Sequence, residues 1–224
     1  AASVLPGPGG GDGTPAASPS PTAAPAPVVP GISPAEAKDI LARCYPGEPA
    51  LQIFNAGPTP WGTRYLVYGP DSSGDCLHAT EGDYRPGVLD QGPTRWLRGP
   101  LTVDRAIRDG QPYDRGPGTF TVQGRVVAGV TQVEIAVGAS RLTVPVRNGT
   151  YMAAMTVSAH EVSQAGDARF RALDGTGRVV YASPAASRPR QVDTRCWAAP
   201  DGTVLRGDIP PEPGQACEPA VRWR

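Results

Sequence analysis

The chain has 224 residues with 21 basic and 21 acidic side chains, so its formal net charge is zero. Glycine and proline make up about a quarter of the residues, whereas Leu, Ile, Val and Phe make up less than a fifth, which is thin for one fully packed globule. A neutral chain without a basic run is a poor nucleic-acid binder, because that binding depends on neutralising phosphates. No run of 18 apolar residues is present, so we expect no membrane span within this sequence.

Residues 1–32 consist almost entirely of Ala, Pro, Gly, Ser and Thr. Such a segment buries too little apolar surface to offset the entropy lost on ordering. We therefore expect a disordered stalk that holds a folded domain away from a surface, with a plain disordered terminus as the alternative. Ala1–Leu5 lacks the charged start and apolar core of a signal peptide. This suggests a processed piece that was tethered by a removed N-terminal anchor.

The four cysteines predict the compartment. Cys44, Cys76, Cys196 and Cys217 allow three pairings, and none lies in a C-x-x-C motif. An even number at wide spacing, in a Pro-rich chain with a thin core, is typical of disulfides in an oxidising compartment. We favour the sequence-local pairs Cys44–Cys76 and Cys196–Cys217 and an extracytoplasmic location, either secreted or membrane-anchored. The alternative is four reduced thiols in a cytosolic protein.

A small α+β unit with a long loop is expected over 33–117. Ser33 is a candidate N-cap, with Pro34 at the first helical position and Glu36 completing a capping box. The apolar spacing that follows ends at Cys44, which therefore faces inward. Three short strands are expected next, at 50–55, 63–68 and 75–80, and the third presents Cys76 to the helix. Residues 81–117 are dense in mixed charge and are expected to be mainly a solvated connection.

Residues 118–183 carry the clearest pattern, a strict alternation of apolar and polar residues that indicates half-buried strands. Six such strands at regular spacing predict a small immunoglobulin-like antiparallel β-sandwich, so the fold class is mainly β. Asn148-Gly149 is a favoured two-residue hairpin turn, and the strand from Tyr151 is expected to return along its predecessor. Pro145 cannot donate to a ladder, which favours an edge strand there.

Residues 184–224 return to Pro and Arg and form a tail that a Cys196–Cys217 disulfide would close around the turn at Asp201. Trp197 and Trp223 are expected either at the surface or as clamps on the sandwich.

Motifs for chemistry are scarce. The chain has two histidines, no G-x-S-x-G elbow, no phosphate-binding loop and no second ligand pair at zinc spacing. We therefore assign no catalytic, cofactor-binding or metal-ligating residue and expect no enzyme and no cofactor. The candidates for surface recognition are the aromatic and basic residues Trp61, Trp96, Arg95 and Arg98, which would suit a sugar- or peptide-binding face. Packing at the rim of the core is the more ordinary role for the two tryptophans.

The order of these features resembles the extracytoplasmic domains of actinobacterial single-span membrane proteins. In those proteins a Pro-rich stalk leads to a helix ending in Arg-Cys, strands ending in a second Cys, and a β-sandwich with a G-x-V-x-x-x-V-T-x-V pattern. The matching segments here are 43–44, 74–77, 108–113, 124–133, 146–151 and 177–180. The resemblance spans roughly 33–183 and implies no catalytic residue. The second cysteine pair and the tail depart from the pattern.

Taken together, the sequence predicts a non-catalytic extracytoplasmic binding or sensing domain of a bacterial cell-envelope protein, with a protein or envelope partner and no nucleic acid. The alternative is a structural spacer or assembly subunit of an envelope complex, and a cell-envelope enzyme is the least favoured class.

Overall fold

The computed structural model describes residues 26–92, 94–109, 117–158, 160–161, 168–183, 196–205, 214 and 216–224. Most of the stalk expected over 1–32 lies outside these residues. The described chain is mainly β, as predicted, with the helix α1 (Pro34–Cys44) and five small sheets. Its strands are β1 (Gln52–Thr59), β2 (Gly62–Tyr68), β3 (Ser72–Ala79), β4 (Tyr84–Pro86), β5 (Asp90–Gln91), β6 (Trp96–Leu97), β7 (Leu101–Asp109), β8 (Gly118–Val126), β9 (Val130–Val137), β10 (Ser140–Pro145), β11 (Thr150–Val157), β12 (Arg169–Asp174), β13 (Val179–Ala182), β14 (Trp197–Ala198), β15 (Val204–Leu205), β16 (Glu218–Pro219) and β17 (Val221–Arg222).

The helix lobe consists of α1 and the sheet formed by β1 to β5. The Ser33 Oγ accepts the backbone N–H of Glu36 at 3.2 Å, which confirms the predicted cap. The buried face of α1 carries Ile40 and Cys44 onto one face of the sheet. A disulfide joins Cys44 to Cys76 on β3, with 6.1 Å between their Cα atoms, so the predicted pair is confirmed.

The sandwich lobe packs two sheets face to face. One has the order β11-β8-β7 and the other the order β10-β9-β12-β13. The chain pairs β7 with β8, crosses to β9 and β10, crosses back to β11, and returns to β12 and β13. This Greek-key order is that of an immunoglobulin-like sandwich, and the sandwich itself is the fold expected from the alternation. Its core is closed by side chains such as Phe120, Ile135 and Tyr151, each at most 1% exposed.

The sandwich begins earlier than the sequence indicates. The expected connection over 81–117 contains the nine-residue strand β7, which pairs with β8 and precedes the expected start at residue 118. The register of this pair shifts between Val103 and Arg105, so Asp104 is a bulge residue. A bulge breaks the two-residue alternation by which a strand is recognised in a sequence. The neighbouring charges of Asp104 and Arg105 are also typical of a solvated loop.

The Asn148-Gly149 turn is present, with positive φ at both residues as that turn requires. The expected return along the preceding strand is wrong, however, because β10 pairs with β9 whereas β11 pairs with β8. Only the single bridge between Arg147 and Thr150 flanks the turn. A two-residue turn reverses the backbone locally, and the pairing of the next strand depends on which sheet offers a free edge. Pro145 lies in the edge strand β10, as predicted.

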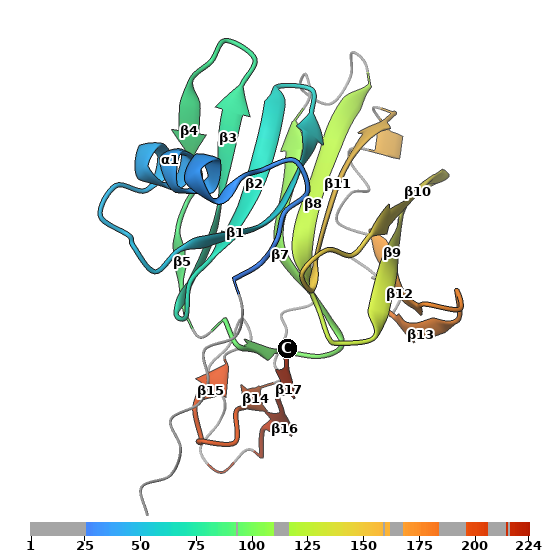
Figure 1. The fold of residues 1–224 in the computed structure, drawn as a ribbon. Helices are drawn as coiled ribbons and strands as arrows, with labels where there is room; N and C mark the ends of the chain where they lie inside the picture. The colour runs from blue at the N-terminus through green and yellow to red at the C-terminus, as the bar shows by residue number, and fades with distance from the viewer. Residues whose placement is uncertain are drawn as a thin grey trace, which may run out of the picture.

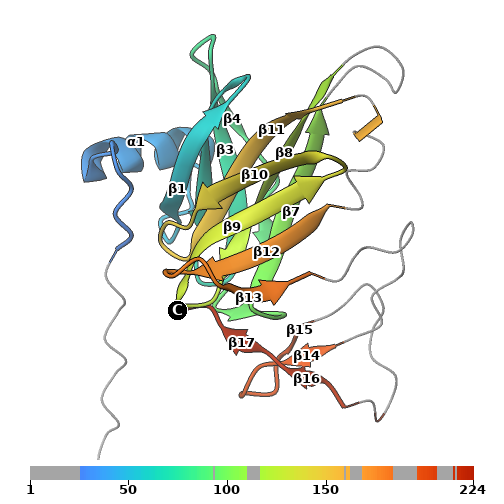
Figure 2. The same cartoon turned by 90° about the vertical axis from the view of Figure 1, so that its right-hand side faces the viewer.

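The two lobes stack so that α1, the helix-lobe sheet, the β11-β8-β7 sheet and the second sandwich sheet form four successive layers (Figures 1 and 2). Strand β8 is consequently buried on both faces. Thr121, Gln123 and Arg125, expected on a solvent-facing side, are 1%, 3% and 8% exposed. The alternation of apolar and polar residues shows which face of a strand is polar. Whether that polar face is exposed to water depends on the layer packed against it, which here is the helix lobe.

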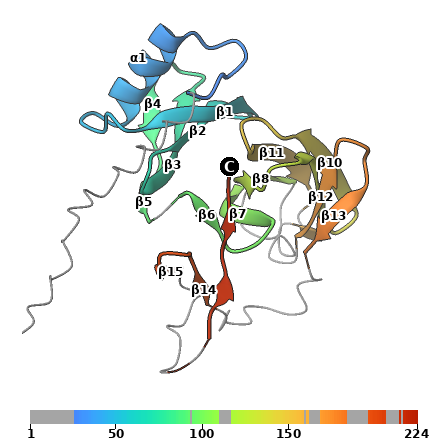
Figure 3. The same ribbon diagram turned by 60° about the horizontal axis from the view of Figure 1, so that its bottom comes forward.

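The described strands of the tail, β14 to β17, lie below the two lobes in Figure 1 and come toward the viewer in Figure 3. The Cys196–Cys217 disulfide is confirmed and closes a small sheet of order β15-β14-β16. Beyond it, β17 pairs with β6. Trp197 and Trp223 are each 4% exposed, so the two tryptophans are buried rather than surface aromatics.

Candidate functional site

The layer between the two lobes is polar, and the bulge in β7 creates much of it. Thr102 and Asp104 lie two residues apart and share the face that meets the helix lobe, and the bulge brings Arg105 to the same face. Opposite them on β8 are Gln123 and Arg125. Two charge networks form in this layer, one around Asp75 and one around Asp104.

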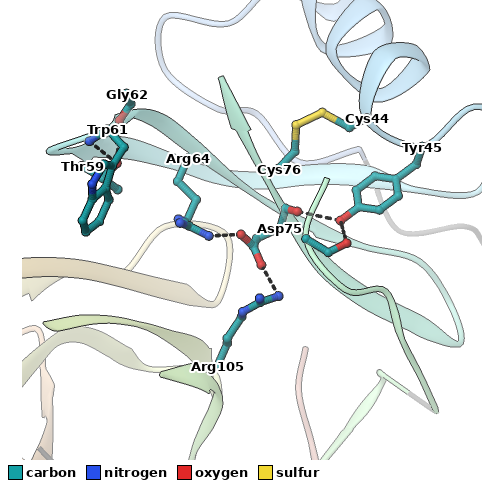
Figure 4. A network of polar contacts seen from close by, with 10 residues as sticks. Cys44, Tyr45, Thr59, Trp61, Gly62, Arg64, Asp75, Cys76 and Arg105 are labelled. Carbon is teal, nitrogen blue, oxygen red and sulfur yellow. Dashed lines mark hydrogen bonds and ion pairs between the residues drawn. A yellow bond between two sulfur atoms is a disulfide. The ribbon is translucent and has the colours of Figure 1, made fainter. Parts of the chain in front are cut away.

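The Asp75 network ties the disulfide strand to the sandwich (Figure 4). The Asp75 carboxylate, 1% exposed, receives Nη1 of Arg64 on one oxygen and Nη1 of Arg105 on the other, the latter at 2.7 Å. The Tyr45 hydroxyl donates to the carbonyl of Asp75 at 2.6 Å. Burial, followed by the nearby Asp75 charge, raises the pKa of Tyr45 to about 12, so this hydroxyl stays a donor.

The Asp104 network lies beside the first, since Asp104 directly precedes Arg105 in β7. Nε and Nη2 of Arg125 hold the two Asp104 oxygens at 2.8 Å each, a bidentate pair. The Tyr68 hydroxyl donates to the same carboxylate at 2.9 Å, and burial followed by the Asp104 charge raises the pKa of Tyr68 well above its usual range. The Arg125 Nη1 also contacts the carbonyl of Thr94. Both Asp104 oxygens are therefore committed to protein donors.

An aromatic clamp holds the tail against both lobes. The ring of Trp223 stacks on Phe54 at 5.0 Å and lies 5.0 Å from Tyr68. Its Nε1 donates to the carbonyl of Gly149 at 2.8 Å, and a Cβ at position 149 would lie 2.7 Å from that nitrogen. The Asn148 amide donates to the carbonyl of Phe54 at 2.9 Å. The predicted Asn-Gly turn thus serves as a docking point between the lobes.

Two hollows open on either side of residues 94–98. The Trp96 pocket has a volume of about 450 Å³ and is lined by residues that include Asp90, Trp96, Arg98, Thr102, Asp104 and Arg125. The second, the Trp223 hollow, has a volume of about 690 Å³ and is lined by Phe54, Tyr68, Arg95, Trp223 and Arg224 among others. The Arg224 guanidinium already covers its rings, 4.5 Å from the Phe54 centroid.

A third hollow, an apolar groove of about 840 Å³, runs between residues 26–33, α1 and β1. None of the four predicted recognition residues lines it.

The structure places two of the four predicted recognition residues in one pocket and a third in the neighbouring hollow. Trp96 is half-buried and lines the Trp96 pocket with exposed Arg98, while exposed Arg95 lines the Trp223 hollow. Trp61 does not join them. It lies in the β1–β2 turn at the start of β2, and Thr94 bonds to the carbonyl of Pro70 beyond the other end of that strand. A seven-residue strand places the two ends about 20 Å apart.

Sequence reasoning missed Thr102, Asp104 and Arg125. Arg125 belongs to the alternating pattern, which predicts a solvent-facing side chain, whereas Asp104 and Thr102 lie in the stretch expected to be a loop. The Thr102 Oγ1 is buried and has no hydrogen-bond partner among the described residues. No pattern in the sequence indicates a buried hydroxyl without a hydrogen-bond partner. Its burial depends on the bulge in β7 and on the lobe that faces it.

Within the described ranges, no group of three or more His, Cys, Asp and Glu residues is placed to hold a metal ion. Cys76 is committed to its disulfide, and the His78 ring stacks on Tyr84 at 4.4 Å. The helix in this part of the chain is not long and apolar enough to cross a membrane. The two disulfides point to an oxidising, extracytoplasmic environment.

Comparisons with protein-family models, curated proteins and solved structures gave no match. The resemblance to actinobacterial membrane-protein ectodomains therefore stays a prediction.

Proposed function

We propose that this chain is a non-catalytic binding or sensing domain of a bacterial cell-envelope protein and that its ligand enters the Trp96 pocket. The protein works outside the cytoplasm, either secreted or membrane-anchored with this domain outside. The observation that carries the proposal is a polar pocket at the junction of two lobes, where binding sites of globular proteins commonly form. The resemblance to actinobacterial ectodomains is part of the same proposal.

The arrangement of charges supports binding over catalysis. A general acid or base needs a carboxylate free to exchange a proton with the ligand. The Asp104 carboxylate is held by Arg125 and Tyr68, and neither His78 nor His160 lines the pocket. Asp90 is the carboxylate of the lining that no protein donor holds, and the described residues of the lining include no second free carboxylate or histidine to complete an acid–base pair with it.

The cross-linked body favours one alternative, a structural spacer or assembly subunit. The contacts of Asp75 with Arg105 and of Tyr68 with Asp104 fix the lobes to one another. One disulfide stiffens the helix lobe and the other closes the tail, and a spacer would need that rigidity.

Indole N–H resonances separate these classes. We would label the tryptophans with ¹⁵N and titrate the protein separately with the polysaccharide, lipid and protein fractions of a bacterial cell envelope. A binding domain shows a saturable shift of the Trp96 signal with one fraction, while the Trp61 signal stays in place as the internal control. Shifts of neither signal with any fraction would favour the spacer. Chemical conversion of the bound fraction would contradict the non-catalytic assignment.

A further inference from the structure

The charge of the Trp96 pocket is balanced. Its lining contains two acidic side chains, Asp90 and Asp104, and two basic ones, Arg98 and Arg125. Asp104 and Arg125 also neutralise one another directly through their bidentate pair. An anion would meet the Asp90 carboxylate and a cation would meet the Arg98 guanidinium, so the lining favours a ligand without net charge.

Several hydrogen-bonding groups of this lining are left for a ligand. The Thr102 hydroxyl is buried without a partner among the described residues. Leaving such a group unpaired costs free energy, and a ligand that bonds to it would recover that cost. Ser73 and Asp90 are directly opposite partners of β3 and β5 and so share one face, and their hydroxyl and carboxylate make no side-chain hydrogen bond within the described residues. These groups converge as donors and acceptors on one space, which suits a ligand with several hydroxyls.

The remaining walls are apolar. Trp96, half-buried, presents an indole to the pocket, and Val204 and Leu205 of the disulfide-closed tail line another side. An aromatic face next to polar groups matches a pyranose ring, whose C–H groups form an apolar face and whose rim carries hydroxyls. A volume of about 450 Å³ lies in the range of small-ligand pockets.

We infer that the Trp96 pocket is a binding site for a neutral saccharide, with one sugar ring on the Trp96 indole and a sugar hydroxyl donating to or accepting from Thr102. This rests on the proposed binding function and names its ligand class. A flat aromatic, a set of uncommitted polar groups and a zero net charge are the three observations that carry it.

The test uses sugars of one shape and three charges. Glucose, glucuronate and glucosamine differ mainly in charge, and galactose, mannose, N-acetylglucosamine and the disaccharides cellobiose and maltose extend the neutral set. Each is titrated to 50 mM into the ¹⁵N-tryptophan-labelled protein, which we choose because single-site sugar affinities of about millimolar are expected for so few contacts. At least one neutral sugar is expected to shift the Trp96 signal saturably and more strongly than glucuronate or glucosamine does.

Two variants and one control test the individual residues of the pocket. Thr102→Val keeps the shape and removes a buried hydroxyl that has no partner in the described residues, so we expect equal or higher stability and affinity weakened by about three- to tenfold. Trp96→Ala should abolish detectable binding, followed then through the shift of the Trp197 signal, because the guanidinium of Arg98 in the pocket lies 5.8 Å from the Trp197 ring centroid. Trp61→Ala is the matched control and should bind normally. Thr102→Val binding as tightly as the parent protein would overturn the assigned contact.

The failure of the inference is distinct from that of the proposed function. If no neutral sugar moves the Trp96 signal, or if glucuronate or glucosamine binds more tightly, the saccharide assignment is wrong. A shift of the same signal by an envelope fraction would then still uphold a binding domain with another ligand. If neither sugars nor envelope fractions move it, both proposals fail.

Discussion

Replacing Cys44 and Cys76 together by alanine is expected to lower the melting temperature of the protein markedly. Their disulfide links α1 to the third strand of the helix-lobe sheet across a sequence separation of 32 residues. Both side chains are buried, at 3% and 0% exposure. Alanine avoids placing new hydroxyls in this apolar cluster, so the measured effect reports the cross-link and the lost sulfur contacts.

The size of the effect follows from loop closure. For a loop of this length the chain-entropy model gives a stabilisation of about 3.7 kcal/mol. In a protein of this size each kcal/mol corresponds to about 2–4 °C in melting temperature, so a drop of about 7–15 °C is expected. The two missing sulfur atoms add to that loss, because the cluster around Ile40 and Tyr65 loses packing contacts.

The assay is thermal unfolding followed by circular dichroism, and Cys196→Ala/Cys217→Ala provides the matched control. That loop is shorter, with a separation of 21, and the model gives about 3.4 kcal/mol for it. It closes only two-residue strands at the periphery, so its loss should open the tail locally and shift the main transition less. A Cys44→Ala/Cys76→Ala variant that melts within about 2 °C of the parent would refute the reasoning that the cross-link holds this lobe together.

Three further changes test the inter-lobe layer and the Glu161 cap at the β9–β10 turn. Asp75→Asn is expected to destabilise the protein by about 3–5 kcal/mol in urea unfolding, because Arg64 and Arg105 keep their charges without the carboxylate, and an unchanged midpoint would contradict this. Trp223→Ala should cost about 3–5 kcal/mol by the same measurement, and a loss below 1 kcal/mol would mean that the clamp is not formed. Glu161 accepts N–H groups from the β9–β10 turn and from its own cap, hydrogen bonds that lower its pKa to about 2. Since this pKa is depressed, the stability advantage over Glu161→Gln should be full above about pH 4.5 and disappear as the pH falls toward 2, and melting curves at a series of pH values would show no such convergence if the cap were absent.

Local signals in the sequence predicted local structure well. Ser33 at the helix start, the inward spacing that ends at Cys44, and the Asn-Gly turn each depend on neighbours within a few residues. Both disulfides followed from the same logic, because Cys76 lies on a strand close in sequence to the helix and Cys217 lies close to Cys196.

Features that depend on a second layer escaped prediction. Gln123 alternates with core residues as an exposed side chain would, yet the helix lobe covers it. The bulge at Asp104 hid a strand, and with it Thr102, which faces the pocket. Trp96 and Arg98 could be proposed from residue type alone, since an aromatic residue among charges is notable wherever it folds. Trp61 met the same criterion and lies far from them, because residue type says nothing about distance.

The buried charges between the lobes restrict how this protein can evolve. Asp75 forms ion pairs with two arginines from different lobes, and Asp104 pairs with Arg125 and accepts a hydrogen bond from Tyr68. A substitution at any one of these positions leaves a buried partner without its counter-charge or hydrogen bond. This lowers the stability of the protein more than most surface substitutions do. In homologous chains we therefore expect the members of each network to be substituted together. Correlated substitutions between β3 and β7 would then mark the contact between the two lobes.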